Sequence, residues 1–357
     1  MEWGYDGKLY VSDFISGWES HKAGRIYTME QSNTGDEVAR IIASGISKKS
    51  SDDLAKLLTH PDLRLRLRAQ YHLAGREDAL PIFISAANQR LNPTERLHGI
   101  WGLGMLARKE KSEPASSFLI RALKNADHIV RGQAAQALGE STLTDGSPLL
   151  PLLQDPSPRV RALAAIALGR KPAPDGTSHL VALLEENNDR DPYLRHAGIM
   201  GLTGNATPKE IISLASHASA AVRRAAVIAL RRLQNPEIVR FIADPDLHVS
   251  SEAIRAINDT GLFSVRAALA ALLDDYNADS KNPGRPLSRM MIRRLLHSAY
   301  RLGHDKNLLR LIKFASHQKN DQAERLEAMR LISVWTEPHV VDQSIGKHSP
   351  ASPRKTD

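Results

Sequence analysis

The sequence predicts an all-α solenoid of about eight to nine repeated helix pairs, preceded by a short N-terminal β-hairpin. Two observations carry this prediction. One short pattern of arginine, small residues and leucine recurs along most of the chain, and aromatic and β-branched residues gather in the first 27 positions. The composition, with 42% hydrophobic and 25% charged residues over 357 positions, is that of a folded chain long enough for such an array.

The repeat is defined by an arginine that is followed by a small residue three places later and by leucine seven places later. The clear copies begin at Arg66, Arg96, Arg131, Arg161, Arg195 and Arg223. Successive arginines are 30, 35, 30, 34 and 28 residues apart, and a period of this size is typical of a solenoid. Weaker copies follow around Ala253, Ser298 and Arg325.

Each repeat is expected to hold two helices, as residues 145–169 illustrate. Ser147 is predicted to cap a short first helix over "LLPLL". A turn at 155–158 then leads into a second helix whose apolar residues recur at helical spacing from Val160 onward. Gly169 is expected to end that helix in a left-handed conformation.

The segment "DPSPRVRALAAIALG" (155–169) resembles HEAT-like repeats, in the short form also found in phycobilisome (PBS) lyases. The resemblance spans residues 36–340 and implies an α-α superhelix, an armadillo-type fold. In such arrays the helix arginine usually pairs with turn carboxylates or carbonyls. We therefore interpret the recurring arginines as structural, because an active site would occur once and not in every repeat.

Two segments interrupt the array. Residues 274–286, "DDYNADSKNPGRP", are rich in turn formers and are predicted to be an inserted loop on a functional face. Residues 344–357 are polar and rich in proline and serine, which predicts a disordered tail.

The N-terminal segment 1–31 differs in composition from the rest. It holds six of the 17 aromatic residues, namely Trp3, Tyr5, Tyr10, Phe14, Trp18 and Tyr27. "KLYVSD" and "GRIYTME" are predicted to be two paired strands with apolar residues on both faces. A lone hairpin is marginally stable and its free edges invite association, so this one is expected to join a sheet that the chain does not encode.

The pattern "DG-x-LYVSD…GRIY" resembles the last blade of a β-propeller of the glucose/sorbosone dehydrogenase-like kind. A blade followed by HEAT-like repeats is similar to large secreted bacterial composite proteins of the membrane-bound dehydrogenase type, which also carry a c-type cytochrome domain. The resemblance implies that the chain is a fragment of a larger redox protein. A propeller dehydrogenase domain or a c-type cytochrome is then its expected protein partner. The compartment is expected to be periplasmic or extracellular in that case, and cytoplasmic if the chain is complete as given.

Several chemistries are not expected in this chain. It contains no cysteine, which excludes disulfides, thiolate metal sites, a cysteine nucleophile and covalent haem attachment. No H-E-x-x-H, phosphate-loop or G-x-S-x-G motif occurs, and no apolar run of about 18 residues predicts a membrane span. The catalytic blades of the propeller family are also absent. We therefore predict no enzymatic activity, no cofactor, no metal and no catalytic residue.

The net charge of +8 is concentrated in one segment. Residues 281–313 hold nine Lys and Arg against one acid, and the other 39 basic and 39 acidic residues cancel. Within it, Arg289, Arg293, His297 and Arg301 are spaced four apart, on one face of a predicted helix. They are candidate contacts for an anionic partner. The alternative interpretation is a solvated outer face.

The sequence thus favours a non-catalytic scaffold that binds a protein partner. A first alternative is a HEAT-like nucleic-acid-binding protein or glycosylase that uses segment 281–313. It has less support, because no aromatic side chains interleave with the arginines to stack on bases. A second alternative is a bilin-lyase-like repeat protein.

Overall fold

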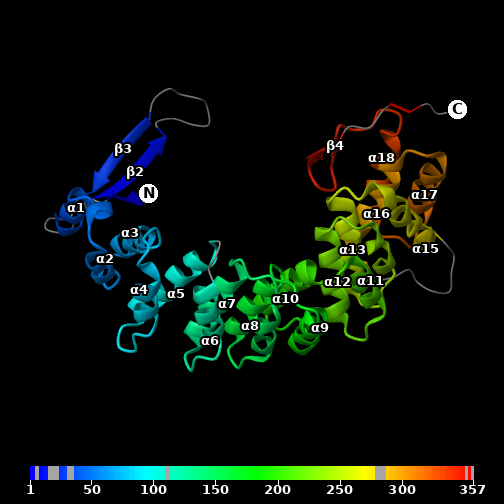
Figure 1. Cartoon of the computed structure of the whole chain (residues 1–357). Helices are drawn as coiled ribbons and strands as arrows, with labels where there is room; N and C mark the ends of the chain where they lie inside the picture. The colour runs from blue at the N-terminus through cyan, green and yellow to red at the C-terminus, as the bar shows by residue number, and fades with distance from the viewer. Residues whose placement is uncertain are drawn as a thin grey trace. The chain divides into compact units, whose positions relative to one another are not determined.

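A computed structural model describes residues 1–4, 8–14, 24–29, 36–109, 113–277, 287–349 and 353–354. The fold is all-α apart from a three-stranded sheet near the N-terminus and a two-stranded sheet near the C-terminus of the described residues, which confirms the predicted fold class. The chain divides into two compact units, Met1–Thr144 and Asp145–Asp357. Figure 1 shows both units as successions of short helices joined by tight turns.

The first unit begins with the predicted hairpin. Its long strands, β2 (Leu9–Phe14) and β3 (Gly24–Met29), pair antiparallel with Leu9 opposite Met29. A short strand that the sequence did not suggest, β1 (Glu2–Trp3), pairs with the other edge of β2. Tyr5 and Trp18, two of the six aromatic residues of segment 1–31, lie outside the described residues.

The helices of the first unit follow as pairs, α2 with α3, α4 with α5 and α6 with α7 (Figure 1). The elements are α1 (Asp36–Ala43), η1 (Ile46–Lys48), α2 (Ser51–Leu57), α3 (Leu63–Leu73), α4 (Ala79–Ala87), α5 (Pro93–Ala107), α6 (Glu113–Ala122) and α7 (His128–Gly139). Arg64 of α3 donates hydrogen bonds to the carbonyl oxygens of Trp3 and Gly4 and so joins the sheet to the helices.

The second unit continues the same plan. Its elements are η2 (Ser147–Gln154), α8 (Pro158–Leu168), α9 (Gly176–Asn187), α10 (Pro192–Asn205), α11 (Pro208–Ser213), η3 (Leu214–Ser216), α12 (Ala220–Arg232), η4 (Pro236–Phe241), α13 (Leu247–Asp259), η5 (Phe263–Val265), α14 (Arg266–Ala271), α15 (Leu273–Asn277), α16 (Arg289–Leu302), α17 (Asp305–Ser316), α18 (Gln322–Ser333), β4 (Val341–Asp342) and β5 (Lys347–His348). One apolar core runs through it from Leu184 to Trp335.

The second helix of each repeat starts at a polar N-cap residue. These caps are Asp62, Asn92, Asp127, Ser157, Asp191, Ser219, Asp246 and Asp321. In all of these except Ser157, the side chain accepts a hydrogen bond from a backbone N–H of the first turn, and Ser288, the N-cap of α16, is a second exception. In seven of the eight helices with these caps an arginine lies four residues after the cap, whereas Ser250 occupies that position in α13.

The repeat arginines bind the turn that precedes their own helix. In three of them, Nη1 donates to the carbonyl oxygens six and five residues earlier. These contacts are Arg66 with His60 (2.5 Å) and Pro61 (2.7 Å), Arg131 with Asn125 (2.8 Å) and Ala126 (2.9 Å), and Arg223 with His217 (2.8 Å) and Ala218 (2.9 Å). Each guanidinium therefore ties the start of a helix to the turn before it.

Carboxylates add a second contact at several of these positions. Arg96 pairs with Asp127 of the next repeat, and Arg161 lies 3.9 Å from Glu186. Arg195 lies 3.7 Å from Asp189, in the turn before its own helix. The most buried pair is that of Arg223, whose Nε and Nη2 donate to Asp244 at 2.7 and 3.0 Å.

Two local predictions within residues 145–169 are wrong. The first helix, η2, is a 3-10 helix that begins at Ser147, with Gly146 and not Ser147 as its N-cap, and Pro151 inside it cannot donate a backbone hydrogen bond. Gly169 adopts the right-handed helical backbone conformation, with φ −65°, and not the expected left-handed one. Its small size serves packing, because a Cβ there would lie 2.5 Å from the carbonyl oxygen of Met200 in α10.

The two predicted interruptions also need correction where the structure describes them. Residues 274–277 of the expected loop belong to α15, and residues 278–286 lie outside the described part. Residues 344–349 of the expected disordered tail form a turn and strand β5, which pairs with β4. Asp342 holds this turn, because its Oδ1 accepts hydrogen bonds from the backbone N–H (2.9 Å) and hydroxyl (2.5 Å) of Ser344.

Among the described helices, none is both long and apolar enough to cross a membrane unaided. One bent pair, formed by α13 and the segment Phe263–Tyr276, meets the length and composition criteria together.

The substitution Gly169→Ala should destabilise the second unit by about 1–3 kcal/mol, because the new methyl group would overlap the Met200 carbonyl. The matched control is Gly75→Ala, whose Cβ would lie an unstrained 3.4 Å from the nearest atom, the carbonyl oxygen of His72. That change should be neutral or stabilising by up to about 1 kcal/mol. Urea unfolding of the two variants measures the difference, and equal effects would contradict the packing role of Gly169.

The substitution Arg223→Met should lower the free energy of unfolding by about 3–4 kcal/mol, because it leaves the carboxylate of Asp244 buried without its cation. Arg240→Met is the control, since Arg240 pairs with Glu237 at an exposed site and should lose less than about 1 kcal/mol. Denaturant unfolding monitored by circular dichroism compares them. Similar losses in both variants would argue against a stabilising role of the repeat arginine.

The buried ring of His98 is expected to make the free energy of unfolding depend on pH. This ring meets Gln70 Oε1 at 2.7 Å and Arg66 Nε at 3.1 Å, and burial, aided by the charge of Arg66, lowers its pKa from 6.5 to about 4. The unfolded chain therefore binds a proton below about pH 6.5 that the folded chain rejects until about pH 4.

Between pH 7 and pH 5, the wild-type chain should lose about 1–2 kcal/mol more stability than His98→Gln. Unfolding free energies measured across this range test the expectation, with His128→Gln as a control for loss of an exposed histidine. Parallel curves for wild type and His98→Gln would show that His98 does not titrate differently in the folded state.

Candidate functional site

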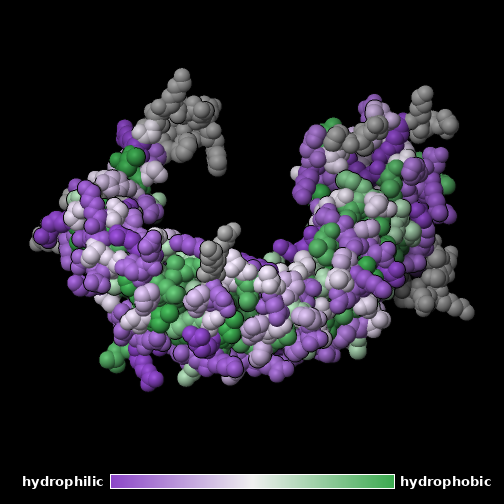
Figure 2. Space-filling model, in the orientation of Figure 1, coloured by the Kyte–Doolittle hydropathy of each residue, from purple (hydrophilic) through white to green (hydrophobic). Residues whose placement is uncertain are grey.

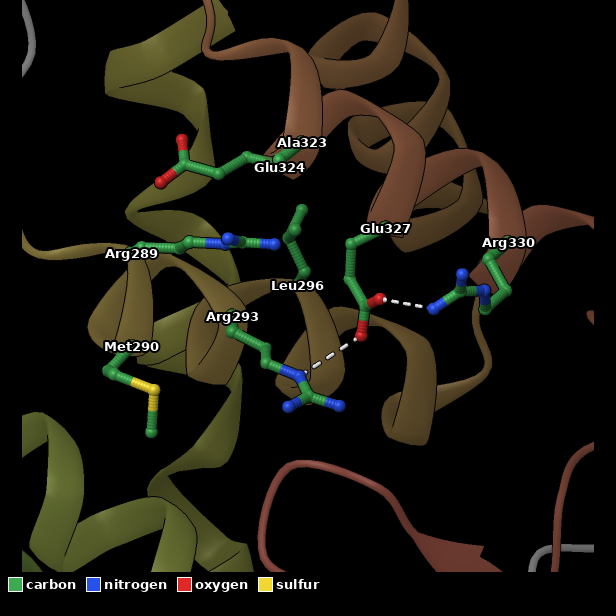
Figure 3. A pocket seen from close by; sticks show the side chains of 8 residues that line it. All are labelled: Arg289, Met290, Arg293, Leu296, Ala323, Glu324, Glu327 and Arg330. Atoms are coloured by element: carbon green, nitrogen blue, oxygen red, sulfur yellow. Dashed lines mark hydrogen bonds and ion pairs between the residues drawn. The ribbon is translucent and has the colours of Figure 1, made fainter.

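Helices α16 and α18 enclose a pocket of about 300 Å³ that includes two of the residues singled out from the sequence. Arg289 and Arg293 reach from α16 toward α18, which supplies Glu324, Glu327 and Arg330 (Figure 3). The Asp321 cap fixes the start of α18, because its side chain accepts hydrogen bonds from two backbone N–H groups of the first turn.

Glu327 is the centre of the charge network in this pocket. Its carboxylate accepts hydrogen bonds from Arg293 Nε (3.1 Å) and Arg330 Nη1 (3.1 Å), which Figure 3 shows as dashed lines. The ring Nε2 of His297 lies 2.9 Å from the same carboxylate. Burial alone would raise the pKa of Glu327, but the hydrogen bond from His297 and the charge of Arg293 outweigh it and hold the pKa below 4.5.

The structure separates the four predicted contacts into two groups. Arg289 is exposed and the side chain of Arg293 is 37% exposed, so both are open to a partner. His297 is buried against Glu327, with Asp342 at 3.7 Å from Nδ1. Burial lowers the pKa of His297, although both carboxylates oppose this effect.

The side chain of Arg301 is only 3% exposed. It donates to the carbonyl oxygens of His339 (3.1 Å) and Ser349 (2.5 Å), and its Nε lies 3.8 Å from Asp342. The four predicted contacts therefore do not form one continuous surface, because the segment after α18 packs over the last turns of α16. The expectation of four accessible side chains fails at His297 and Arg301 for this reason.

Most described cations of the basic segment are neutralised by carboxylates outside it. Arg294 binds Asp259 of α13 through two hydrogen bonds of 2.9 and 2.8 Å. Arg310 binds Asp274 of α15 through contacts of 2.7–3.1 Å. Lys281 and Arg285 lie outside the described residues. Few cations thus remain for nucleic-acid phosphates, which weakens the nucleic-acid alternative.

The pocket carries charged groups of both signs and is therefore suited to recognition of a charged partner. Glu327 is held by three donors, and the other carboxylate, Glu324, has a pKa raised by burial and by the neighbouring Asp321. Within the described ranges, no group of three or more His, Asp or Glu side chains is arranged to hold a metal ion.

Sequence reasoning missed Glu327, Arg330 and Asp342 as members of this network. The three-residue spacing of Glu327 and Arg330 on one helix signals their pairing. Asp342 followed two residues later by Ser344 signals a local turn. No local pattern indicates that this turn would lie on α16.

A family model described as HEAT repeats matches residues 146–218 and, again, residues 208–282. These residues form a HEAT-like repeat array, in agreement with the resemblance found in the sequence. No curated protein sequence matches the chain.

Among solved structures, the chain is similar to an engineered protein at 16% identity and a TM-score of 0.35, with 79% of this chain and 88% of that chain covered. It is also similar to YibA of Escherichia coli at 17% identity and a TM-score of 0.32, with 85% of this chain and 99% of that chain covered.

The substitution Glu327→Gln should destabilise the second unit by about 2–4 kcal/mol, because it leaves Arg293, Arg330 and buried His297 without their shared carboxylate. Glu324→Gln is the control in the same pocket and should change stability by less than about 0.5 kcal/mol, since burial already disfavours its charged form. Chemical denaturation of both variants measures the contrast. If Glu324→Gln proved the more damaging, the network would not depend on Glu327.

Proposed function

We propose that the chain is a non-catalytic scaffold and that its N-terminal sheet is a docking surface for a β-rich protein partner. HEAT repeats are in general protein-interaction modules, and the repeat arginines described above are engaged in holding turns and helices together.

The observation that carries the proposal is the exposure of apolar side chains on the sheet. Trp3, Ile26, Tyr27 and Met29 are 59%, 71%, 46% and 56% exposed. Ile26 and Tyr27 are adjacent in β3, so their side chains lie on opposite faces of the sheet. Figure 2 shows hydrophobic atoms at the surface of this sheet.

Strand β3 also pairs only with β2 among the described strands, which leaves its other edge open. An open edge offers backbone N–H and C=O groups to a further strand, and exposed apolar residues would be covered by the partner. A β-propeller meets both needs, since its blades supply strand edges and apolar faces.

The proposed partner is therefore a propeller dehydrogenase domain of the kind that the N-terminal pattern resembles, with a c-type cytochrome as a further member of the assembly. The array would space the dehydrogenase from its electron acceptor. This role places the chain in the periplasm or outside the cell, where such composite proteins work.

The experiment is a binding measurement between the full chain and a separately purified glucose/sorbosone dehydrogenase-like propeller. Ile26→Lys should weaken binding about tenfold or more, because it places a charge in the covered apolar surface. Leu91→Lys is the matched control, since Leu91 is 97% exposed and lies outside the sheet.

Equal binding by wild type and Ile26→Lys would remove the sheet as the docking surface. If neither the propeller nor a c-type cytochrome bound the wild-type chain, the redox assembly would be refuted, while a scaffold role for other partners would stand.

A further inference from the structure

A second pocket, of about 330 Å³, lies between the end of α13, the start of α14 and the β4–β5 turn. It shares no lining residue with the pocket between α16 and α18. Three of its lining residues, Arg266, Lys347 and His348, can donate a hydrogen bond from a cationic or imidazole nitrogen.

Arg266 is the unusual member of this pocket. Only 6% of the residue is exposed, yet its guanidinium forms no hydrogen bond and no ion pair with any described residue, and its Nε is fully buried without a partner. Its one contact of note is with the ring of Phe263, 4.6 Å from Cζ to the centroid. A guanidinium carries five N–H donors, and buried arginines are otherwise paired, so an acceptor is missing here.

The two carboxylates that line the pocket do not supply this acceptor. Asp259 is held by Arg294 through two hydrogen bonds. Asp342 accepts hydrogen bonds from Ser344 and faces His297 and Arg301. Both carboxylates are therefore engaged by other side chains, and Asp342 acts on Arg266 through its charge alone, without a hydrogen bond or an ion pair.

Two further donors stand at the mouth of the pocket. Lys347 and His348 are exposed on β5, and the ammonium of Lys347 has only a 3.4 Å contact with the carbonyl oxygen of Asp259. The pocket thus combines a buried guanidinium with an ammonium at its rim, and neither cation forms an ion pair with a carboxylate of the described residues.

We propose that this pocket binds a phosphate group, with Arg266 as the interior donor and Lys347 and His348 at the rim. A phosphate dianion carries two negative charges, one for each of the cations Arg266 and Lys347, whereas a carboxylate carries only one. The planar guanidinium can donate two parallel hydrogen bonds to phosphate oxygens, and the lysine adds a point charge. The cavity is larger than a phosphate ion, so a small phosphate monoester fits as well as the free ion.

The primary test is a thermal-shift and calorimetric titration of the full chain with inorganic phosphate, at constant ionic strength set with chloride. A saturable rise in Tm is expected with phosphate, because a ligand that binds only the folded state stabilises it. Phosphoethanolamine forms a second arm that distinguishes a monoester from the free ion, and acetate forms a third that represents a carboxylate.

Arg266→Gln should weaken phosphate binding about tenfold or more, and Lys347→Ala should weaken it about threefold. Arg240→Gln removes an exposed arginine elsewhere in the same unit and should leave binding unchanged. Lys347 and His348 are exposed, so Lys347→Ala and His348→Ala keep the test decisive if Arg266→Gln does not fold.

No saturable effect of phosphate over chloride in the wild-type chain would overturn the proposal. So would phosphate binding that persists in both Arg266→Gln and Lys347→Ala, since the ion would then bind elsewhere. Tighter binding of acetate than of phosphate would refute the assignment of a dianion.

Discussion

The repeat depends on how closely neighbouring helices can approach one another. Where α8 meets α10, Gly169 lies against the backbone of Met200, and a Cβ on Gly204 would lie only 1.9 Å from the carbonyl oxygen of Gly169. Alanines fill most of the remaining positions on this face of α8. Small residues therefore set the spacing of the helices, and the leucines between them can fill the core only because that spacing is short.

Local chemistry explains why much of the architecture is predictable from sequence. The cap residue, the arginine four positions later and the leucine after it all act within one helix, so they leave a visible pattern around Arg66, Arg131 and Arg223. The hairpin is equally local, because β2 and β3 are consecutive strands that pair antiparallel. In each case the interacting groups are close in sequence, and their spacing carries the structural information.

The unpredicted features join residues that are far apart in the chain. Arg294 finds Asp259 at a separation of 35 residues, and Arg310 finds Asp274 at 36. Arg301 reaches Ser349 across 48 positions. These pairings depend on how one repeat stacks on the next, which composition and spacing do not reveal. The candidate site was therefore predicted only in part: Arg289 and Arg293 are accessible, while His297 and Arg301 belong to an internal network.

The ion pairs of this network change the interpretation of the basic segment 281–313, whose composition alone suggests an anion-binding surface. Arginines of α16 and α17 hold carboxylates from α13, α15, α18 and the C-terminal turn, so most of the charge serves cohesion between repeats. Arg354, which follows the β4–β5 turn, is also held against the array, but by a carbonyl oxygen and aromatic rings and not by a carboxylate. Arg354 donates to the carbonyl oxygen of Tyr300 at 2.6 Å and lies over the ring of Trp335, which is itself buried.

In three repeats the arginine that ties a helix to its preceding turn binds main-chain oxygens, and this has a consequence for how those turns can vary. The accepting positions carry His60 and Pro61 in one repeat, Asn125 and Ala126 in another, and His217 and Ala218 in a third. Because every residue type offers the same carbonyl group, the turn tips can change identity while the brace is preserved. Each of these repeats thus supplies a turn at which libraries of side chains could be displayed, and selection for new binding surfaces could act there without rebuilding the repeat.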